Sequence, residues 1–531
     1  MAGPFYLNGM YHMMYQYNPD GPTWGTGKLS WGHSVSGDLV NWAFLDTALE
    51  PTSPFDSDGC WSGSTTVLPD GRPVIIYTGR DSNGLQVQNV AFAKNPSDPL
   101  FREWVKPSVN PVIRQPADVT GNNFRDPTTA WLGRDGLWRV AVAGEVGGVK
   151  SALVYRTADF LNWKRSPAAL HASADDGTAF ECPDLFPVAV DGAHGLDTSV
   201  MVHAAGPDHV IRHVLVLSKM CDEDYYMVGV YDDADDTFVP EEPERGDDVR
   251  SWRRLDHGHV FGAKSFFDAR KKRRVLWAWV EETDGPAGEV VGKDWSGVMT
   301  FPRAVWLDGD GKQLVQWPVE EIETLRTTSD KPVVLEGVGL GSGGRHEIAG
   351  IQALQADVEV VFEIPNLEDA EMLDPTWLRD PQKLCKEKGA AQGGVGPFGL
   401  VVMASGNMEE HTSVFFRVFK HEDKYKVLMC TDLTRSSKKE GVLKPVYGGF
   451  VDVDVAKDRR ISLRTLIDHS VIESFGGGGR TCMTARVYPE HVATGNSSHL
   501  YVFNNGWSAV KVSKLEAWEL RTAAVHVECD A

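Results

Sequence analysis

Two short segments place carboxylates beside residues suited to acid–base chemistry. In the segment 124–127 (FRDP), Arg125 precedes Asp126, and a guanidinium keeps a neighbouring carboxyl ionised and in place. In the segment 180–184 (FECPD), Glu181 lies among apolar neighbours, which favour the protonated form that a general acid needs. Taken alone, the first segment also fits a structural turn and the second a surface Glu beside a buried strand.

Aromatic and polar residues near the N-terminus could bind a sugar. An indole ring can stack on the apolar face of a sugar, and amide or hydroxyl groups can bond its hydroxyls. The residues of this kind are Gln16, Trp24, Trp61 and Ser62. The chain has 17 Trp, most of which a β-rich core would account for. Each residue taken singly also fits a core or turn position.

The amino-acid composition restricts the class of binding partner. The formal net charge of -21 opposes binding to nucleic acids and anionic membranes, whereas a neutral sugar is compatible with it. No apolar run has the length of a membrane span, and residues 1–6 lack the basic and apolar regions of a signal peptide. We therefore expect a small-molecule partner, and neither a nucleic acid nor a membrane.

The seven cysteines argue against a metal centre. They contain no C-x-x-C pair, so a zinc or iron–sulfur cage is not indicated, and we expect no metal and no cofactor. An odd count leaves at least one free thiol. One disulfide remains possible.

The strand patterns predict an all-β protein. Short apolar runs bounded by Gly, Pro, Asp and Asn fill the first ~320 residues, for example 73–77 and 274–279. The pattern D-x-x-N-W occurs at Asp38–Trp42 and again at Asp159–Trp163, and partial copies end at Trp104 and Trp252. Repeated strands that close on a Trp are typical of propeller blades.

A boundary follows the repeats. Residues 318–326 are charged and compatible with a helix, and 337–344 are rich in glycine. Strand alternation then resumes at 358–363 and 412–419, which favours a β-sandwich. We predict a propeller over 1–320, a linker over 321–335 and a sandwich over 336–531.

Six motifs in a fixed order resemble glycoside hydrolase family 32, and within it the plant acid invertases and fructan exohydrolases of cell-wall type. They lie at 11–19 (YHMMYQYNP), 31–36 (WGHSVS), 61–64 (WSGS), 124–127 (FRDP), 181–184 (ECPD) and 468–475 (DHSVIESF). The resemblance runs from about residue 3 to about 522. It implies a five-bladed β-propeller followed by a C-terminal β-sandwich.

The resemblance also implies residue roles. Glu181 matches the general acid/base, and Asp126, with Arg125 beside it, matches the carboxylate that holds fructose hydroxyls and stabilises the transition state. The implied sugar-contacting positions are Gln16, Trp24, Trp61, Ser62 and Asp256. The resemblance further implies a Cys385–Cys430 bridge, glycosylation at Asn496, a monomer, and location in the cell wall.

The catalytic nucleophile of the family falls outside this sequence. The family opens with W-M-N-D-P-N-G-P, whose Asp is the nucleophile, and Gly3-Pro4 matches its last two residues. The Asp would stand directly before Met1. Three explanations stay open: an active enzyme whose opening segment precedes Met1, an inactive relative that binds sugars, or a water or other carboxylate that substitutes. We interpret Asp20, in a similar N-P-D-G-P run, as a turn residue.

The implied reaction is retaining hydrolysis of terminal non-reducing β-D-fructofuranosides, with sucrose as the first substrate and fructans as the alternative. Pro183 resembles the cell-wall and exohydrolase branch. Asp256-His257-Gly258 stands where the family has D-Y-G, and 218–226 lacks the D-x-x-K pattern of sucrose-preferring members. Both departures favour the fructan alternative. A fructosyltransferase is a third, weaker option.

Overall fold

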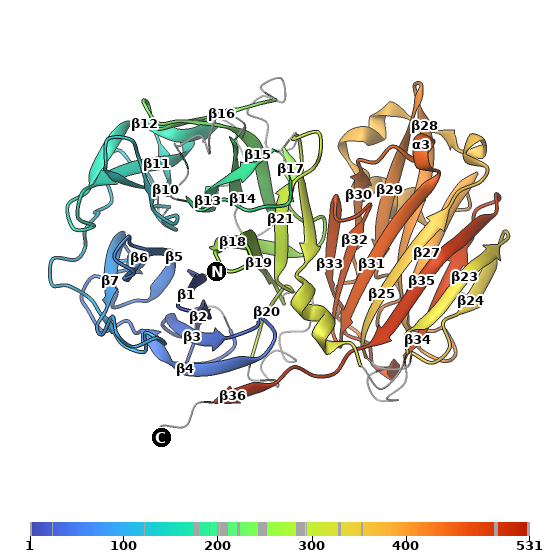
Figure 1. The fold of residues 1–531 in the computed structure, drawn as a ribbon, viewed down its shortest axis with the longest axis horizontal. Helices are drawn as coiled ribbons and strands as arrows, with labels where there is room; N and C mark the ends of the chain where they lie inside the picture. The colour runs from blue at the N-terminus through green and yellow to red at the C-terminus, as the bar shows by residue number, and fades with distance from the viewer. Residues whose placement is uncertain are drawn as a thin grey trace.

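The structure is a computed structural model that describes residues 3–23, 25–121, 123–173, 180–190, 192–198, 201, 211–219, 223–242, 252–282, 293, 295–327, 331–351, 354–492 and 498–527. Nearly all of its regular elements are β-strands, as the sequence predicted. Figure 1 shows two parts side by side, a ring of sheets and a pair of stacked sheets.

Residues 5–318 form the ring. The first sheet has strands β1 (Phe5–Leu7), β2 (Met10–Tyr17), β3 (Ser30–Ser36) and β4 (Trp42–Leu49). The second has β5 (Cys60–Val67), β6 (Pro73–Arg80), β7 (Gln86–Ala93) and β8 (Trp104–Val105). The third has β9 (Trp131–Leu132), β10 (Trp138–Val146), β11 (Val149–Thr157) and β12 (Lys164–Ser173).

Two more sheets complete the ring. The fourth has β13 (Phe180–Ala189), β14 (Ile211–Lys219), β15 (Glu223–Asp232), β16 (Thr237–Pro240) and β17 (Arg253–Arg254). The fifth has β18 (Val260–Asp268), β19 (Arg273–Val280), β20 (Val298–Met299), β21 (Arg303–Leu307) and β22 (Leu314–Pro318). Strand β1 contacts β5 and β18, and β13 contacts β10 and β18, so these strands face the centre, where Figure 1 places the N-terminus.

The hydrophobic cores of this part lie between neighbouring sheets. One core joins Met14 and Trp31 of the first sheet to Ile75 of the second, and another joins Ile76 of the second to Val142 of the third. Further cores join the third sheet to the fourth, the fourth to the fifth, and the fifth to the first. Strands such as β6 are therefore apolar on both faces, because each face meets a neighbouring sheet.

The two D-x-x-N-W copies form the same turn. In each copy the Asp accepts the backbone N–H groups two and three residues on, and the side-chain amide of the Asn. Leu39 and Phe160 follow Asp38 and Asp159 with φ values of 64° and 62°. The copies link β3 to β4 and β11 to β12, so the sequence repeat marks equivalent turns in two sheets.

A 3₁₀ helix, η4 (Glu320–Leu325), leads from the ring into the sandwich. One sandwich sheet has β23 (Val333–Leu340), β35 (Val510–Glu519), β25 (Gln355–Glu363), β31 (Arg460–Asp468), β32 (Val471–Gly476) and β33 (Thr481–Arg486). The other has β24 (Gly344–Glu347), β34 (His499–Asn504), β27 (Val395–Ala404), β28 (Thr412–His421), β29 (Lys424–Asp432), β30 (Val446–Val451) and β26 (Glu371–Met372). Short helical turns occur at η5 (Leu367–Asp369), η6 (Pro375–Arg379), α2 (Pro381–Leu384), η7 (Cys385–Gly389) and α3 (Val455–Asp458).

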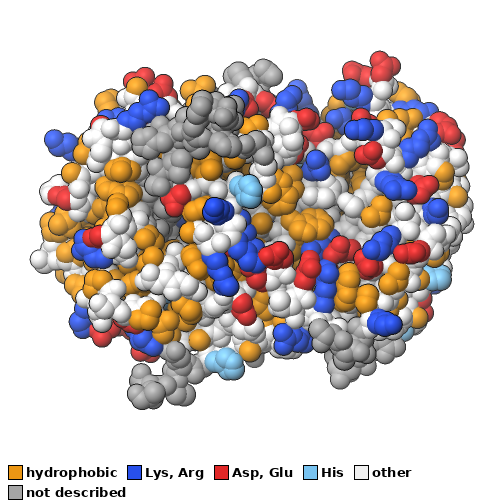
Figure 2. Space-filling view, viewed as in Figure 1, with side chains coloured by type: hydrophobic (Ala, Val, Ile, Leu, Met, Phe, Trp, Pro, Cys, Tyr) orange, Lys and Arg blue, Asp and Glu red, His pale blue; other side chains and the backbone are white. Residues whose placement is uncertain are grey.

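The end of the chain returns to the ring. Strand β36 (Val525–Val527) pairs in parallel with β4, so the first sheet gains a strand from the far end of the sequence (Figure 1). Figure 2 shows acidic and basic side chains interspersed over the sandwich part. Among the described residues, no helix is both long and apolar enough to cross a bilayer.

Candidate active site

The two carboxylate segments lie in neighbouring sheets, one on the inner strand β13 and the other in an extended segment beside β10. Glu181 is the second residue of β13, and Arg125 lies in the extended segment before β9, where it exchanges two backbone hydrogen bonds with Ala143 of β10 (3.0 and 2.9 Å). The guanidinium of Arg125 forms a salt bridge with Glu181, and its Nε lies 3.7 Å from Oδ2 of Asp126. One cation therefore holds both of the carboxylates selected from the sequence.

The backbone at this point is strained. Asp126 and Cys182 have φ values of 64° and 47° in the left-handed region, which non-glycine residues seldom adopt. Such residues cluster at functional sites. The N–H of Cys182 donates to Oδ2 of Asp126 at 3.0 Å, and the pairing of β13 with β14 shifts register between Glu181 and Asp184. A bulge of this kind re-aims a side chain, here Glu181.

Charge and burial define the state of the groups. Burial lowers the pKa of Arg125, but Asp126 and Glu181 raise it by more, so the guanidinium stays charged. The contact between Arg125 and Glu181, which are 56 residues apart in the chain, is visible only in the fold. The side chains of Arg125 and Glu181 keep 11% and 9% exposure, so solvent or a ligand can reach them.

Cys182 does not supply a nucleophile. Burial, and secondarily the charge of Asp126, raise the pKa of its thiol well above the ordinary value. A protonated buried thiol is unreactive. The contribution of Cys182 to this cluster is its backbone N–H.

The predicted sugar-contacting residues lie on the adjoining strands. Trp61 and Ser62 are half-buried near the start of β5, and Ser64 on the same strand donates to the carbonyl of Pro127 at 2.8 Å. Gln16 is half-buried near the end of β2, the partner of β1. Trp24 lies outside the described residues. Asp20 is in an exposed turn, where its carboxylate accepts the N–H of Lys28 at 3.2 Å.

The structure places Asp256 at the contact between the ring and the sandwich. Its Oδ1 accepts the N–H groups of Gly258 and Thr484 (2.7 and 2.9 Å), and its Oδ2 accepts Nη1 of Arg303 and Oγ1 of Thr484 (2.9 and 2.8 Å). Burial raises the pKa of Asp256, but Arg303 and these hydrogen bonds lower it by more. Protein groups therefore occupy both carboxylate oxygens of Asp256 at this contact.

The same interface explains the 468–475 motif, to which sequence reasoning gave no role. Glu473 accepts Nη2 of Arg303 at 2.7 Å and the N–H of Phe301 at 2.6 Å, fully buried between the two parts. Burial raises the pKa of Glu473, with Arg303 opposing. The motif therefore joins the sandwich to the ring.

Cys385 and Cys430 form a disulfide within the sandwich, the pairing that the resemblance implied. Cys60, Cys182 and Cys482 are buried free thiols. Asn496 lies outside the described residues. Within the ranges that the structure describes, His, Cys, Asp and Glu side chains form no group of three or more suited to a metal ion.

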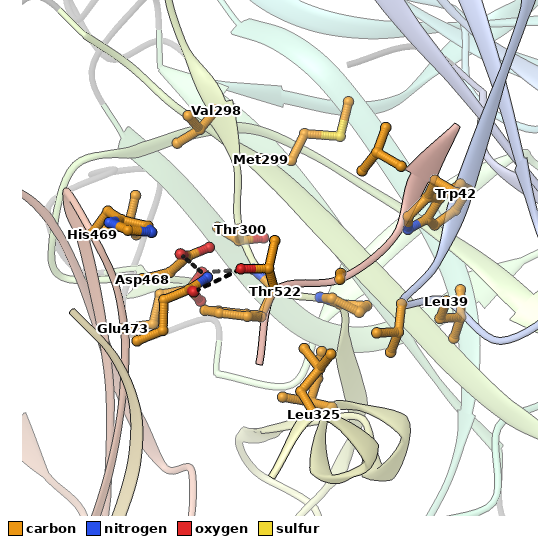
Figure 3. A pocket seen from close by; sticks show the side chains of 18 of the residues that line it. Leu39, Trp42, Val298, Met299, Thr300, Leu325, Asp468, His469, Glu473 and Thr522 are labelled. Carbon is orange, nitrogen blue, oxygen red and sulfur yellow. Dashed lines mark hydrogen bonds between the residues drawn. The ribbon is translucent and has the colours of Figure 1, made fainter. Parts of the chain in front are cut away.

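A separate cavity of about 820 Å³ lies between the first and fifth sheets and the sandwich. Figure 3 shows Leu39, Trp42, Val298 and Met299 on its apolar walls, and Asp468 and Thr522 at its polar end. The side chain of Gln355 donates to Oδ1 of Asp468 at 2.9 Å and accepts Oγ1 of Thr522 at 3.2 Å. Its lining contains neither Glu181 nor Asp126, so it is distinct from the carboxylate cluster.

Comparison with known proteins assigns the family. Residues 1–318 match the model of the glycosyl hydrolases family 32 N-terminal domain, and residues 321–519 match that of the family 32 C-terminal domain. The chain belongs to glycosyl hydrolase family 32. It is 67% identical over 528 residues to "Beta-fructofuranosidase, insoluble isoenzyme 7" of Oryza sativa subsp. japonica, covering 99% of this chain and 87% of that protein. It is 62% identical to "Fructan 6-exohydrolase" of Triticum aestivum, covering 99% and 88%.

Solved structures of the family agree. Fructan 1-exohydrolase IIa from Cichorium intybus matches with a TM-score of 0.94 and 47% identity, over 99% of this chain and 96% of that one. A second structure of that protein is a complex with 1-kestose. The family 32 assignment and the architecture of β-propeller and β-sandwich are thus confirmed, and the protein is a glycoside hydrolase.

Proposed function

We propose that this protein hydrolyses terminal non-reducing β-D-fructofuranosyl residues, from sucrose first and from fructans as the alternative. The observation that carries the proposal is the Arg125 guanidinium between Asp126 and Glu181. Relatives named β-fructofuranosidase and fructan 6-exohydrolase are more than 60% identical to the chain. The replacement of D-Y-G by Asp256-His257-Gly258 and the absence of D-x-x-K from 218–226 favour the fructan alternative within this proposal.

Each residue takes one step of a retaining reaction. Glu181 protonates the glycosidic oxygen as the bond breaks, and then removes a proton from the water that releases fructose. Asp126 accepts hydrogen bonds from the fructosyl hydroxyls, and its fixed negative charge stabilises the oxocarbenium-like transition state.

The nucleophile in this proposal is the Asp of the W-M-N-D-P-N-G-P motif, whose last two residues match Gly3-Pro4. The position of β1 at the centre of the ring supports this proposal. Strand β1 contacts β5 and β18, and the carbonyl of Gly3 accepts Oγ1 of Thr65 at 3.0 Å. A carboxylate three residues ahead of Gly3 would therefore lie near β13, which carries Glu181, and near the segment that carries Asp126. Retaining enzymes need two carboxyl groups about 5–5.5 Å apart.

The architecture in this proposal is a five-bladed propeller over 1–320, a linker over 321–335 and a sandwich over 336–531. The cores that join each of the five sheets to the next, and the fifth to the first, support closure of the ring. Gln16, Trp61 and Ser62 bind the sugar, and the protein acts as a monomer in the cell wall. Light scattering and immunolocalisation in tissue test the last two statements.

The test of the function is release of fructose by an extended chain, with W-M-N-D-P-N placed directly before Gly3. We expect fructose from sucrose, inulin or levan. An extended chain that folds but releases none from all three refutes the proposal. Calorimetry of the present chain tests the second candidate, a silent sugar-binding relative, which is refuted if sucrose and short fructans give no binding heat.

A further inference from the structure

The segment that carries Arg125 and Asp126 is held by main chain on one side and by side chains on the other. Toward β10 it forms ordinary backbone bonds, through Arg125 to Ala143 and from the N–H of Thr128 to the carbonyl of Ala141 at 2.9 Å. Toward the second sheet, its polar backbone groups meet buried Thr, Ser and Gln side chains instead. We call the three of these that serve residues 124–126, Thr78, Gln86 and Gln88, the polar ladder.

The polar ladder forms hydrogen bonds with the N–H and carbonyl of Phe124 and with the N–H of Asp126. Oε1 of Gln86 accepts the N–H of Phe124 at 2.9 Å, and Nε2 of Gln88 donates to the carbonyl of Phe124 at 2.8 Å. Oγ1 of Thr78 accepts the N–H of Asp126 at 2.9 Å and donates to Oε1 of Gln88 at 2.8 Å. The three side chains are between 0% and 2% exposed, so water does not replace any of these bonds at low cost.

Two contacts connect the polar ladder to the carboxylate cluster. Thr78 holds the N–H of Asp126, the residue with the left-handed φ of 64°. Gln86 also accepts Nη1 of Arg125 at 3.3 Å, while Nη2 of the same guanidinium bonds Glu181. A strained backbone persists only where its surroundings fix it, and a planar guanidinium is oriented by the partners of its separate nitrogens.

We propose that Thr78 and Gln86 are positioning residues for catalysis: Thr78 fixes the Asp126 carboxylate against the fructosyl unit, and Gln86 fixes Arg125 against Glu181. The inference rests on the proposed function, because it assigns to β6 and β7 the alignment of the residues that carry the reaction. It differs from a purely structural role in one respect. Loss of the Thr78 hydroxyl should slow turnover far more than the same loss elsewhere along the segment.

The chain offers a matched control at Thr66. Its Oγ1, 4% exposed at the residue level, accepts the N–H of Ala130 at 2.8 Å, so it makes the same kind of bond from the second sheet to the same segment. Ala130 is four residues beyond Asp126. Thr66→Val and Thr78→Val each remove one buried hydroxyl, keep the side-chain shape, and leave one backbone N–H without its acceptor. Thr78→Val also removes the donor to Oε1 of Gln88, so Gln88→Leu, which removes that acceptor but keeps the bond from Asp126 to Thr78, is measured beside it.

The experiment measures kcat and KM for sucrose, and thermal unfolding, in the extended chain. A displacement of about 1 Å in a positioning group can cost on the order of a hundredfold. We expect Thr78→Val to lower kcat by about 10- to 100-fold and to change KM by less than about threefold. Thr78→Ser, which keeps the hydroxyl, should keep most of kcat. Gln86→Leu should also lower kcat. Thr66→Val should lose a similar amount of thermal stability while keeping kcat within about twofold.

The outcomes separate this inference from the function on which it rests. If the unmodified extended chain releases no fructose, the proposed function fails. If it is active and Thr78→Val keeps its kcat, or Thr66→Val loses as much, the positioning role is overturned. A crystal structure of Thr78→Val in the present chain decides independently of activity: Asp126 should leave its left-handed conformation and release the N–H of Cys182, and an unchanged Asp126 would overturn the inference.

Discussion

Replacing Asp256 with Ala separates a structural role from a sugar-binding one. The substitution removes all four hydrogen bonds that its two oxygens accept, including the charge-assisted bond from Arg303. Removing one partner of a buried ion pair costs about 3–5 kcal/mol, and Arg303 keeps Glu473, so we expect the lower end, about 3 kcal/mol. With an unfolding entropy of about 2.1 cal/mol/K per residue, a cooperative 531-residue chain would lose about 3 °C in Tm.

The assay is differential scanning calorimetry, together with KM for sucrose in the extended chain. We expect a lower Tm and an unchanged KM for Asp256→Ala. As a control, Asp70→Ala breaks an exposed pair with Arg72 and should leave both quantities unchanged. A raised KM at an unchanged Tm would refute the interface assignment and restore Asp256 as a sugar contact.

Three further predictions concern charge, acid and the disulfide. Arg125→Lys in the extended chain should lower kcat/KM by about 10- to 100-fold, because one ammonium cannot hold Asp126 and Glu181 in the geometry of the guanidinium. Steady-state kinetics at a fixed pH measure this loss, and a loss below about threefold would contradict the prediction. Burial, together with the charge of Arg254, lowers the pKa of His257 to about 4. Between pH 6.5 and 4 the unfolded chain therefore binds a proton at His257 that the folded chain does not bind. The free energy of unfolding falls as pH falls through this range. By pH 4.5 this loss reaches about 2–3 kcal/mol, and His257→Gln should lack it; Tm curves for the two chains that run parallel from pH 7 to 4.5 would refute the prediction. Cys430→Ser removes a disulfide between residues 45 positions apart, and by chain entropy it should lower the free energy of unfolding by about 4 kcal/mol. Denaturant unfolding measures this loss. The wild-type chain in reductant should lose the same amount.

Local patterns predicted the fold well because they act over a few residues. The D-x-x-N-W runs specify a turn in which one Asp accepts hydrogen bonds from the residues two and three positions on, so both copies could be predicted from the sequence. The charged run at 318–326 became η4 for the same reason. The pairing of β36 with β4 was not predictable, since it joins residues about 480 positions apart without any local signal.

The candidate site was predictable in part. Motif residues Arg125, Asp126 and Glu181 meet in the structure, whereas the salt bridge between Arg125 and Glu181 is a contact that spacing does not reveal. The family resemblance assigned Asp256 to sugar binding. The fold places it in the interface between ring and sandwich, where Arg303 and Thr484 approach it from other strands. The polar ladder had one faint signal, the pair Gln86 and Gln88 on one face of an otherwise apolar strand.

The most direct test of the account is the turnover of Glu181→Gln in the extended chain. The amide keeps the size of the side chain and cannot donate the proton, so kcat for sucrose should fall at least about a hundredfold, with Tm and KM little changed. A Glu181→Gln enzyme that folds and keeps more than about a third of its turnover would contradict the account, because proton transfer to the glycosidic oxygen would then come from another group.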